Sequence, residues 1–239
     1  MLLVYSDLIK VSPLLFLTFG GAMVVSLVLG ITVHEFSHAM TANKLGDDTA
    51  CRLGRCSLNP LRHLDPTGTV FLLLGGFGWG KPTPVNPYRL RNGPEAGRAM
   101  VAAAGPISNI VLALLASIPI HAGLVDWRSP FFVPYTVSGW TANEYIGLFL
   151  TAIIIFNVFL AVFNFLPIAP LDGFAVAVGL LPRDLSISLA KLEPYGPGII
   201  MLLFILPLAT AGQISILHHV MSPIINGLTE LIGGEKAIA

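Results

Sequence analysis

Charged residues are scarce in this chain, and their scarcity indicates its class. Of its 239 residues, only 11% are charged and 54% are hydrophobic, whereas a soluble domain carries about 25% charged residues. The mean hydropathy is +0.79. The 13 basic and 13 acidic residues balance each other, which leaves no electrostatic basis for binding nucleic acid. We therefore expect an integral membrane protein that works in the lipid bilayer, without a nucleic-acid partner.

Cysteine is also scarce, because the chain has only Cys51 and Cys56. Four residues separate them, whereas two residues separate the cysteines of a typical zinc ribbon or redox motif. The surrounding stretch is polar. We therefore expect two free thiols on a reducing side of the membrane, rather than a metal site or a disulfide.

Long runs without charge predict four membrane-spanning helices, each reaching the ~20 residues that a helix needs to cross a bilayer. These runs cover residues 13–43, 98–123, 144–166 and 196–216. Weaker apolar stretches would raise the number of crossings to five or six. The expected fold is an all-α polytopic membrane protein in which residues 1–239 form one domain. Its core is expected at about 13–181, with an accessory helix and tail at 196–239.

Two weaker stretches are poorly suited to a spanning helix. TVFLLLGGFGWG (69–80) is apolar but short, rich in glycine and flanked by Pro66 and Pro82. Because glycine and proline interrupt helices, a re-entrant loop or a β-hairpin at the membrane face suits it better than a helix. A second stretch, 167–181, begins with prolines that break any helix at that point.

Lysine and arginine set the expected orientation, because they favour the cytoplasmic side of a membrane. Segment 44–98 has eight of them, whereas loop 121–143 has only Arg128. The eight are Lys44, Arg52, Arg55, Arg62, Lys81, Arg89, Arg91 and Arg98. We expect a multi-pass protein of the cell membrane with segment 44–98 and loop 182–193 in the cytoplasm.

The stretch GITVHEFSHAM (30–40) places two imidazoles and a carboxylate at the end of the first apolar run. On a helix, His34 and His38 lie one turn apart on one face, where they can share a metal ion. Neutral imidazole is a good zinc ligand, and Glu35 would take a proton from a water that the metal acidifies. An ionisable group within a span costs about 2.5–3.5 kcal/mol on insertion scales and is a functional candidate.

The alternative is that the helix has left the lipid at this point, so that the three residues meet headgroups or water. The segment stays largely apolar until Lys44, which favours catalytic zinc. Such a zinc usually has three protein ligands, so a third must come from elsewhere. His121, His218 and His219 are predicted on the opposite side of the membrane. Asp172 is the best candidate, since it is the only acid in 145–183.

Depth in the membrane supports Asp172 as the third ligand. His38 and His34 lie roughly 9–15 Å along the helix from Lys44. Asp172 lies up to roughly 16 Å from Arg183 if that piece is helical. The two halves of the site can therefore meet at one depth on one side of the membrane.

Asn164 opens the proline-broken stretch before Asp172, and two roles for it are open. Its amide would hold a substrate carbonyl or stabilise a developing oxyanion. Alternatively, it would satisfy backbone groups that the prolines leave without partners.

HEFSH (34–38) and NFLPIAPLDG (164–173) together resemble the paired motifs of the site-2 protease family, the intramembrane zinc metalloproteases that cut transmembrane segments. LGRCSLNPLRHLDPTGT, GWGKPTPVNPYRLRN and AAAGPISN resemble its compact bacterial members, so the likeness covers about residues 28–195. The resemblance implies one zinc ion per chain, bound by His34, His38 and Asp172, with Glu35 as general base and Asn164 near the substrate carbonyl.

The resemblance also implies a function, an intramembrane zinc endopeptidase that hydrolyses peptide bonds in or near transmembrane segments of membrane-anchored proteins. Its partners would be those substrates and the bilayer, and its site would open toward the cytoplasm. The family's three-helix core matches the first three spans. Many members carry PDZ or cystathionine-β-synthase-type domains, for which this chain offers no soluble stretch of sufficient length.

Two other functions are open. Membrane-embedded His and Asp also mark ion pathways, so the chain would be a zinc transporter or sensor. A transporter would not need Glu35, and it would more often show repeated halves, which this sequence lacks. The second is a non-catalytic relative that binds membrane substrates, against which the complete ligand set argues.

Three further motifs each have a structural and a functional interpretation. In NPLRHLDPTG (59–68), His63 and Asp65 would bind a second metal or shape the entrance to the active site, but Asn-Pro and Asp-Pro favour a capped turn. GWGKPTPVNP (78–87) would be a strand edge that pairs with substrate or a connector along the membrane.

The third motif is AGPISN (104–109), whose small residues let helices approach closely. Gly105 and Ser108 are expected to serve packing. Asn109 is expected to hydrogen-bond across to the active-site helices.

Overall fold

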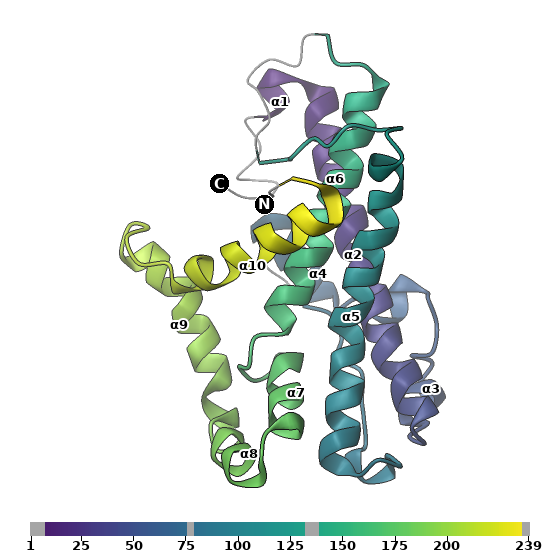
Figure 1. Cartoon of the computed structure of the whole chain (residues 1–239), viewed down its shortest axis with the longest axis vertical. Coiled ribbons are helices and arrows are strands. Elements are labelled where there is room, and N and C mark those ends of the chain that lie inside the picture. Colours follow the sequence, from purple (N-terminus) through teal and green to yellow (C-terminus); the bar gives the residue numbers. More distant parts are fainter. Residues whose placement is uncertain (1–7, 76–78, 132–138, 236–239) are drawn as a thin grey trace.

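The computed structural model describes residues 8–75, 79–131 and 139–235. Within these ranges the regular structure is helical, and the only strand-like pairing is an isolated bridge between Leu64 and Gly80. The α-helices are α1 (Leu8–Val11), α2 (Pro13–Lys44), α3 (Thr49–Arg52), α4 (Pro66–Gly75), α5 (Pro94–His121), α6 (Ala142–Asn164), α7 (Asp172–Leu180), α8 (Arg183–Ala190), α9 (Gly196–Ala209) and α10 (Ile216–Gly233) (Figure 1). Short 3-10 turns are η1 (Pro60–Arg62), η2 (Pro87–Arg89) and η3 (Glu193–Tyr195). The predicted all-α class is confirmed.

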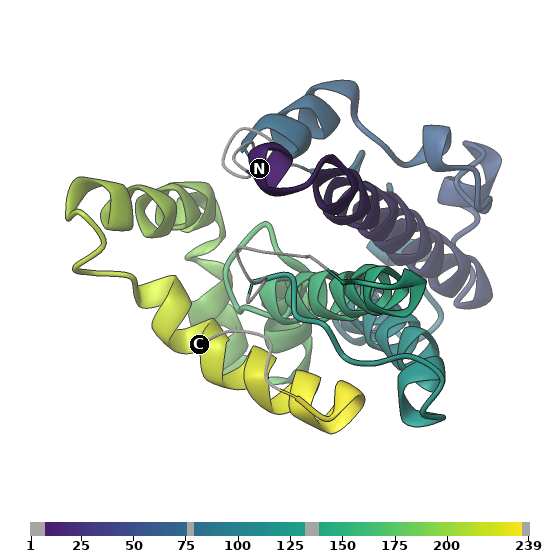
Figure 2. The same ribbon diagram turned by 90° about the horizontal axis from the view of Figure 1, so that it is seen from above.

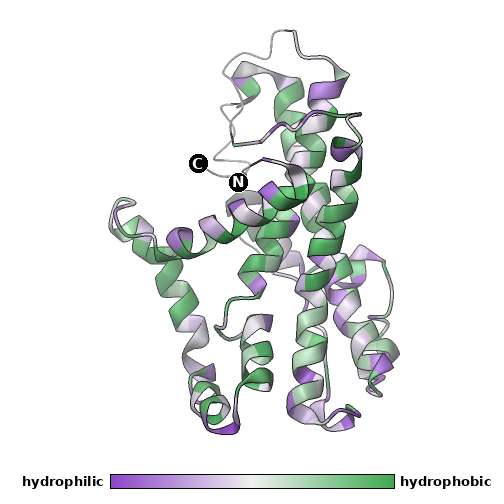
Figure 3. Cartoon of the chain, in the orientation of Figure 1, coloured by the Kyte–Doolittle hydropathy of each residue, from purple (hydrophilic) through white to green (hydrophobic). Residues whose placement is uncertain are grey.

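Four helical stretches are long and apolar enough to cross a membrane: α2, α5, α6 and the run Arg183–Ala209, which joins α8 to α9. The chain is thus a multi-pass membrane protein. α5 begins at Pro94, four residues before the predicted start, because proline is well suited to the first helical position, where its missing N–H costs nothing. Figure 3 shows hydrophobic residues along α6 and α9, while hydrophilic residues gather in loops and at helix ends.

Helices α2, α5 and α6 pack against one another and form the core. α6 lies between two apolar clusters. One, with α2, contains Leu15, Phe19, Met23, Leu148 and Phe156. The other, with α5 and α10, contains Ala113, Ile154, Val158, Met221 and Ile225. Viewed from above, α8, α9 and α10 lie to one side of these three helices (Figure 2).

The stretch expected to be a re-entrant loop or β-hairpin differs in the structure, since residues 66–75 form helix α4. Asp65 starts this helix, because its carboxylate Oδ1 accepts the backbone N–H of Gly68 at 2.8 Å. Pro66 occupies the first turn, where proline is tolerated. Gly75 therefore ends the helix, and Gly68 lies in its first turn; residues 76–78 lie outside the described ranges.

The prediction of free thiols is also wrong, because Cys51 and Cys56 are joined by a disulfide. Cys51 lies in the short helix α3, and the chain then turns at Gly54, whose φ of 76° lies in the left-handed region that glycine tolerates. This turn brings the two Cα atoms to 4.7 Å, within the range that a disulfide spans.

In NPLRHLDPTG the structure supports the capped-turn interpretation. Asn59 Oδ1 accepts the backbone N–H of Leu61 at 3.1 Å, and Asp65 caps α4. His63 is fully buried, and its Nε2 lies 2.6 Å from the carbonyl oxygen of Ser57. These side chains serve the turn, and they belong to no group of possible metal ligands among the described residues.

Asp47 anchors the extended segment 79–86, which leads to the site. Its Oδ2 accepts the backbone N–H of Asn86 at 2.6 Å, and its Oδ1 accepts the hydroxyl of Thr49 at 2.5 Å. Burial raises the pKa of Asp47, but the hydrogen bonds from Thr49 and Asn86 and the charge of Arg89 together hold it below its ordinary value. The carboxylate is therefore charged at neutral pH and ties the segment to the end of α2.

Candidate metal centre

His34 and His38 project from the same face of α2, as their i, i+4 spacing predicts. Both side chains are buried. Their ring centroids lie 4.6 Å apart, with the two planes perpendicular. The helix continues past them to Lys44 without a break, so a rigid element holds both imidazoles.

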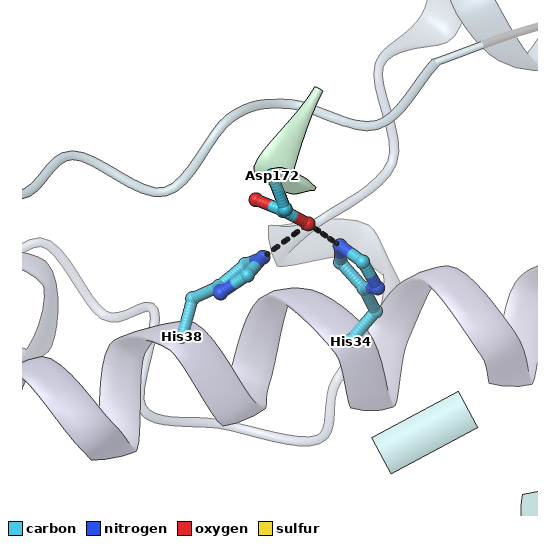
Figure 4. Close-up of side chains that lie close together, drawn as sticks. All are labelled: His34, His38 and Asp172. Atoms are coloured by element: carbon cyan, nitrogen blue, oxygen red, sulfur yellow. Dashed lines mark ion pairs between the residues drawn. The ribbon is translucent and has the colours of Figure 1, made fainter. Parts of the chain in front are cut away.

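Asp172 meets the two histidines from the first residue of α7, as Figure 4 shows. Its Oδ2 lies 3.0 Å from Nε2 of His34 and 3.3 Å from Nε2 of His38. The ligand atoms of the three residues all lie within 4.8 Å of one another. Sequence positions more than 130 residues apart thus converge on one point, because α7 packs beside α5 next to α2.

Gly105 of α5 makes room for this group. A Cβ atom at this position would lie 2.5 Å from Nε2 of His38 and 2.6 Å from Cε1 of His34, far inside van der Waals contact. Only glycine lets α5 approach so closely. The residue expected to serve helix packing therefore also shapes the space around the two rings.

The hydrogen bonds behind the rings determine which nitrogen faces the centre. Nδ1 of His38 lies 2.7 Å from the carbonyl oxygen of Val101. A carbonyl oxygen only accepts, so Nδ1 carries the proton and the Nε2 of the neutral ring presents its lone pair. Nδ1 of His34 lies 2.8 Å from Oδ1 of Asn109, in the same arrangement.

These tautomers test whether the three residues fit a metal. Asp172 Oδ2 is buried and has no hydrogen-bond donor, while both neighbouring Nε2 atoms present lone pairs. Three electron-rich atoms at these distances repel one another unless a cation or additional protons lie among them. Two neutral imidazoles and a carboxylate are ligands that zinc takes in catalytic sites. The residues therefore fit a zinc ion.

Glu35 is held by a residue that the sequence did not single out. The hydroxyl of Thr83 lies 2.7 Å from Oε2 of Glu35 and 3.2 Å from its backbone oxygen. Thr83 belongs to the extended segment 79–86, part of the GWGKPTPVNP motif. This segment therefore contacts the glutamate directly. A hydroxyl between two prolines carries no sequence signal for this contact.

Two cavities of different character meet at the site. One, of about 500 Å³, is lined by the three possible ligands and by Arg98 and Glu193. The other, of about 700 Å³, has a mainly apolar lining that includes Phe163 of α6 and several residues of α9. Both are lined by His34, Glu35, Pro82, Asn164, Pro170, Leu171 and Pro197. Because its lining is the more polar of the two, we name the first the polar cavity and the second the apolar cavity; the histidine and glutamate lie where they join.

Comparison with known proteins agrees with this geometry. Over 191 residues, the chain is 36% identical to "Putative zinc metalloprotease YwhC" of Bacillus subtilis (strain 168), which covers 79% of this chain and 82% of that protein. The chain belongs to the site-2 protease family. Membership identifies it as a zinc metalloprotease with membrane-spanning helices.

More distant relatives of this site-2 protease support the assignment. The chain is 29% identical over 188 residues to "Putative zinc metalloprotease Rip2" of Mycolicibacterium smegmatis (strain ATCC 700084 / mc(2)155), and the match covers 75% of this chain and 65% of that protein. The Rip2 protein of Mycobacterium tuberculosis (strain ATCC 25618 / H37Rv) is 28% identical over 210 residues, covering 82% and 71%. No family model matches the chain, and no solved structure does.

Of the remaining candidates in this protease, Asn164 lies at the cavities of the site, whereas His121, His218 and His219 line neither cavity. Asn164 is the last residue of α6, lines both cavities and donates its amide N–H to the carbonyl of Leu160 at 2.9 Å. Nε2 of His121 lies 2.5 Å from the carbonyl oxygen of Ile232. His218 and His219 are at the start of α10. In the described part of the chain, His34, His38 and Asp172 are the one group of three or more such residues that can bind a metal.

Proposed function

We propose that this site-2 protease is an intramembrane zinc endopeptidase, which hydrolyses peptide bonds in or near transmembrane segments of membrane-anchored proteins. The observation that carries the proposal is the convergence of His34, His38 and Asp172 inside a bundle of apolar helices, with Glu35 where a polar and an apolar cavity join. A soluble protease has no need to bury its site among membrane-spanning helices.

The three ligand residues would bind one zinc ion per chain through Nε2 of each histidine and the carboxylate of Asp172. When bound, zinc supplies a Lewis acid that polarises the scissile carbonyl and acidifies water. The two imidazole rings have fixed orientations, because the amide of Asn109 contacts Nδ1 of His34 and the backbone carbonyl of Val101 contacts Nδ1 of His38. Asp172 completes the group from α7.

Glu35 acts as general base and then as general acid. Its carboxylate takes a proton from the attacking water and later gives a proton to the leaving amine. Thr83 holds the carboxylate through the hydrogen bond to Oε2, which limits the orientations that it samples. Asn164 lines both cavities beside Glu35, and we assign its side chain to the substrate carbonyl, where it would stabilise the developing oxyanion.

The two cavities suit the two needs of the reaction. An intact substrate helix holds its carbonyls in intrahelical hydrogen bonds, so the segment must unwind locally. The apolar cavity between α6 and α9, lined by Phe163, Met201 and Phe204, accepts apolar side chains of that segment. The polar cavity, which reaches Arg98 and Glu193, admits water.

The proposed orientation places the polar cavity on the cytoplasmic side. α3, the start of α5 and α8 all lie at one end of the bundle, the lower end in Figure 1. These three elements belong to segment 44–98 and loop 182–193, in which the positive-inside rule predicts a cytoplasmic location, whereas α4 of the same segment lies near the middle of the view. Water would therefore reach Glu35 from the cytoplasm.

Replacement of the general base tests the proposal. Glu35→Gln should keep one zinc per chain, measured by metal analysis of purified protein, and lower cleavage of a fluorogenic transmembrane peptide by about 10²- to 10⁴-fold. Glu95→Gln, at the exposed start of α5, is the matched control and should cleave at the wild-type rate. Cleavage by Glu35→Gln at the wild-type rate would refute the mechanism.

A transport function would give a different pattern. Zinc uptake into sealed vesicles that His34→Ala abolishes and Glu35→Gln leaves unchanged would favour a transporter instead. Substrates would be found by comparing the membrane proteomes of cells with wild-type protein and with Glu35→Gln, in search of uncut single-span proteins.

A further inference from the structure

Two asparagines lie behind His34, at the point where α2, α5 and α6 cross. Asn109 belongs to α5 and Asn157 to α6, and both side chains are 0% exposed. Asn157 is a polar residue within an apolar stretch of α6. In a bilayer a buried amide is retained only where its hydrogen bonds are satisfied, so the partners of these two amides reveal their role.

The two amides form a chain of hydrogen bonds that ends on the ring of His34. Asn157 donates its amide N–H to the carbonyl of Ile153 at 2.9 Å. Its Oδ1 accepts an N–H from Asn109 at 3.0 Å. The other amide hydrogen of Asn109 goes to the carbonyl of Gly30 at 3.1 Å, and its Oδ1 lies 2.8 Å from Nδ1 of His34.

The chemistry of the partners permits only one direction for this chain. The carbonyl oxygens of Gly30 and Ile153 can only accept, so each must face an amide nitrogen. Asn109 therefore has to turn its oxygen, not its nitrogen, toward His34. That oxygen also only accepts, so Nδ1 of His34 carries the proton, and the lone pair of the neutral ring is placed on Nε2.

Gly30 allows the helices to come close enough for this arrangement. A Cβ atom on Gly30 would lie 2.9 Å from Oδ1 of Asn157 and 2.8 Å from Cδ1 of Leu160. The amides therefore pack directly against the backbone of α2. Backbone atoms, which cannot rotate away, thus determine the orientation of both side chains.

We propose that Asn109 and Asn157 are positioning residues that tune the affinity for zinc by holding His34 in the one tautomer able to bind it. The inference rests on the proposed metal site. The opposite tautomer would set two lone pairs against each other between Nδ1 and Asn109 in an environment of low dielectric, where an unpaired polar contact is costly. A partner of this kind behind a ligating histidine orients the ring and raises its basicity.

A simple role in holding the helices together makes a different prediction. It would lower the stability of the protein with and without metal, and it would leave the affinity for zinc unchanged. The affinity of the folded protein for zinc and the stability of the metal-free protein therefore have to be measured separately.

The experiment measures the dissociation constant for zinc by competition with a chromogenic chelator, on full-length protein in detergent. Asn109→Leu should weaken binding by about 10- to 100-fold. Asn157→Leu should weaken it less, since Gly30 still orients Asn109. Asn109→Asp keeps an oxygen acceptor toward His34 but sets its second oxygen against the oxygens of Gly30 and Asn157. It should therefore bind zinc more tightly than Asn109→Leu while its metal-free form loses thermal stability. With Co²⁺ in place of zinc, Asn109→Leu should also change the visible absorption spectrum.

Two control variants remove buried hydroxyls from the same helices. Ser117 of α5 bonds to the carbonyl of Leu114, and Thr151 of α6 accepts from the backbone N–H of Arg128. Ser117→Ala and Thr151→Val should both bind zinc with wild-type affinity. The thermal midpoint of every variant is measured with excess chelator, which reports on folding alone.

Wild-type affinity in Asn109→Leu would overturn the inference, and so would an equal loss of affinity in the two controls. If Asn109→Leu does not fold, Asn157→Leu and Asn109→Asp decide between the two roles. If the wild-type protein binds no zinc, the proposed metal site is refuted. If the wild-type protein and its asparagine variants bind zinc equally tightly, the metal site stands and only the positioning role is refuted.

Discussion

α6 and the fourth candidate span, Arg183–Ala209, are both apolar enough to cross a membrane, yet the protein buries them differently. In the most apolar part of each, 61% of the residues are buried in α6 and only 6% in the fourth span. α6 carries Thr151, Ala152 and Asn157 on its buried surface, whereas α9 exposes residues such as Leu202 and Leu208. Small and polar side chains, rather than hydropathy, mark the core helix.

The physical reason lies in the solvent. Lipid chains are as apolar as leucine, so burying leucine against another helix gains little. Close packing and interhelical hydrogen bonds stabilise helix association in the bilayer instead. α6 offers both, and α9 mainly offers large aliphatic side chains that lipid accommodates equally well. Substitutions in matched pairs can break or sharpen this comparison.

Glycine gives the largest expected contrast. Gly105→Ala should weaken zinc binding by about 100-fold, because the new methyl group overlaps Nε2 of His38 and overpacking costs up to about 3 kcal/mol. Gly198→Ala in α9 has nothing within 4 Å of the added atom and should leave zinc binding unchanged. Chelator competition measures both. Equal behaviour of the two variants would mean that α5 can move away from the histidines.

Truncation of an aliphatic side chain gives the next contrast. Ile154 of α6 is 0% exposed and Leu208 of α9 is 82% exposed. Ile154→Ala should lower the free energy of unfolding by about 2 kcal/mol, the lower end of the range for buried sites. The variant loses the packing contacts of the removed atoms, but no hydrophobic transfer energy is lost because lipid is as apolar as the protein interior. Leu208→Ala should change it by less than about 0.5 kcal/mol. Denaturation in mixed detergent micelles compares them, and a larger loss for Leu208→Ala would reverse the assignment of core and periphery.

The smallest expected effect concerns a residue outside any helix. Thr83→Val removes the hydroxyl that contacts Glu35 and should lower the cleavage rate by about tenfold, which corresponds to about 1.5 kcal/mol, the value of a hydrogen bond to a charged group. Zinc content should not change. Thr83→Ser keeps the hydroxyl and should retain most of the activity. A full rate in Thr83→Val would show that Glu35 is positioned by the helix alone.

Local patterns in the sequence predicted much of the fold. The run without charge at 13–43 became α2, Pro13–Lys44, almost residue for residue, because helix length in a membrane follows directly from the extent of apolar sequence. The fourth span is Arg183–Ala209 instead of the predicted 196–216, and the two wrong local assignments concern short segments. α4 depends on the cap that Asp65 provides, and the disulfide depends on the turn at Gly54. Neither the cap nor the turn can be recognised from the composition of these segments.

The sequence by itself determined the pairing of His34 with His38, since residues four apart share one face of any α-helix. It also suggested Asp172, through the rarity of acids in apolar surroundings. Tertiary structure alone decided that Thr83 lies over Glu35 and that Gly105 makes room for the rings. The sequence predicted that Asn109 bonds to the active-site helices, which is confirmed, but tertiary structure alone decided that the chain of hydrogen bonds starts at Asn157 and ends on the ring of His34. These contacts join residues dozens of positions apart, and no local periodicity encodes them, because they depend on how closely three helices approach.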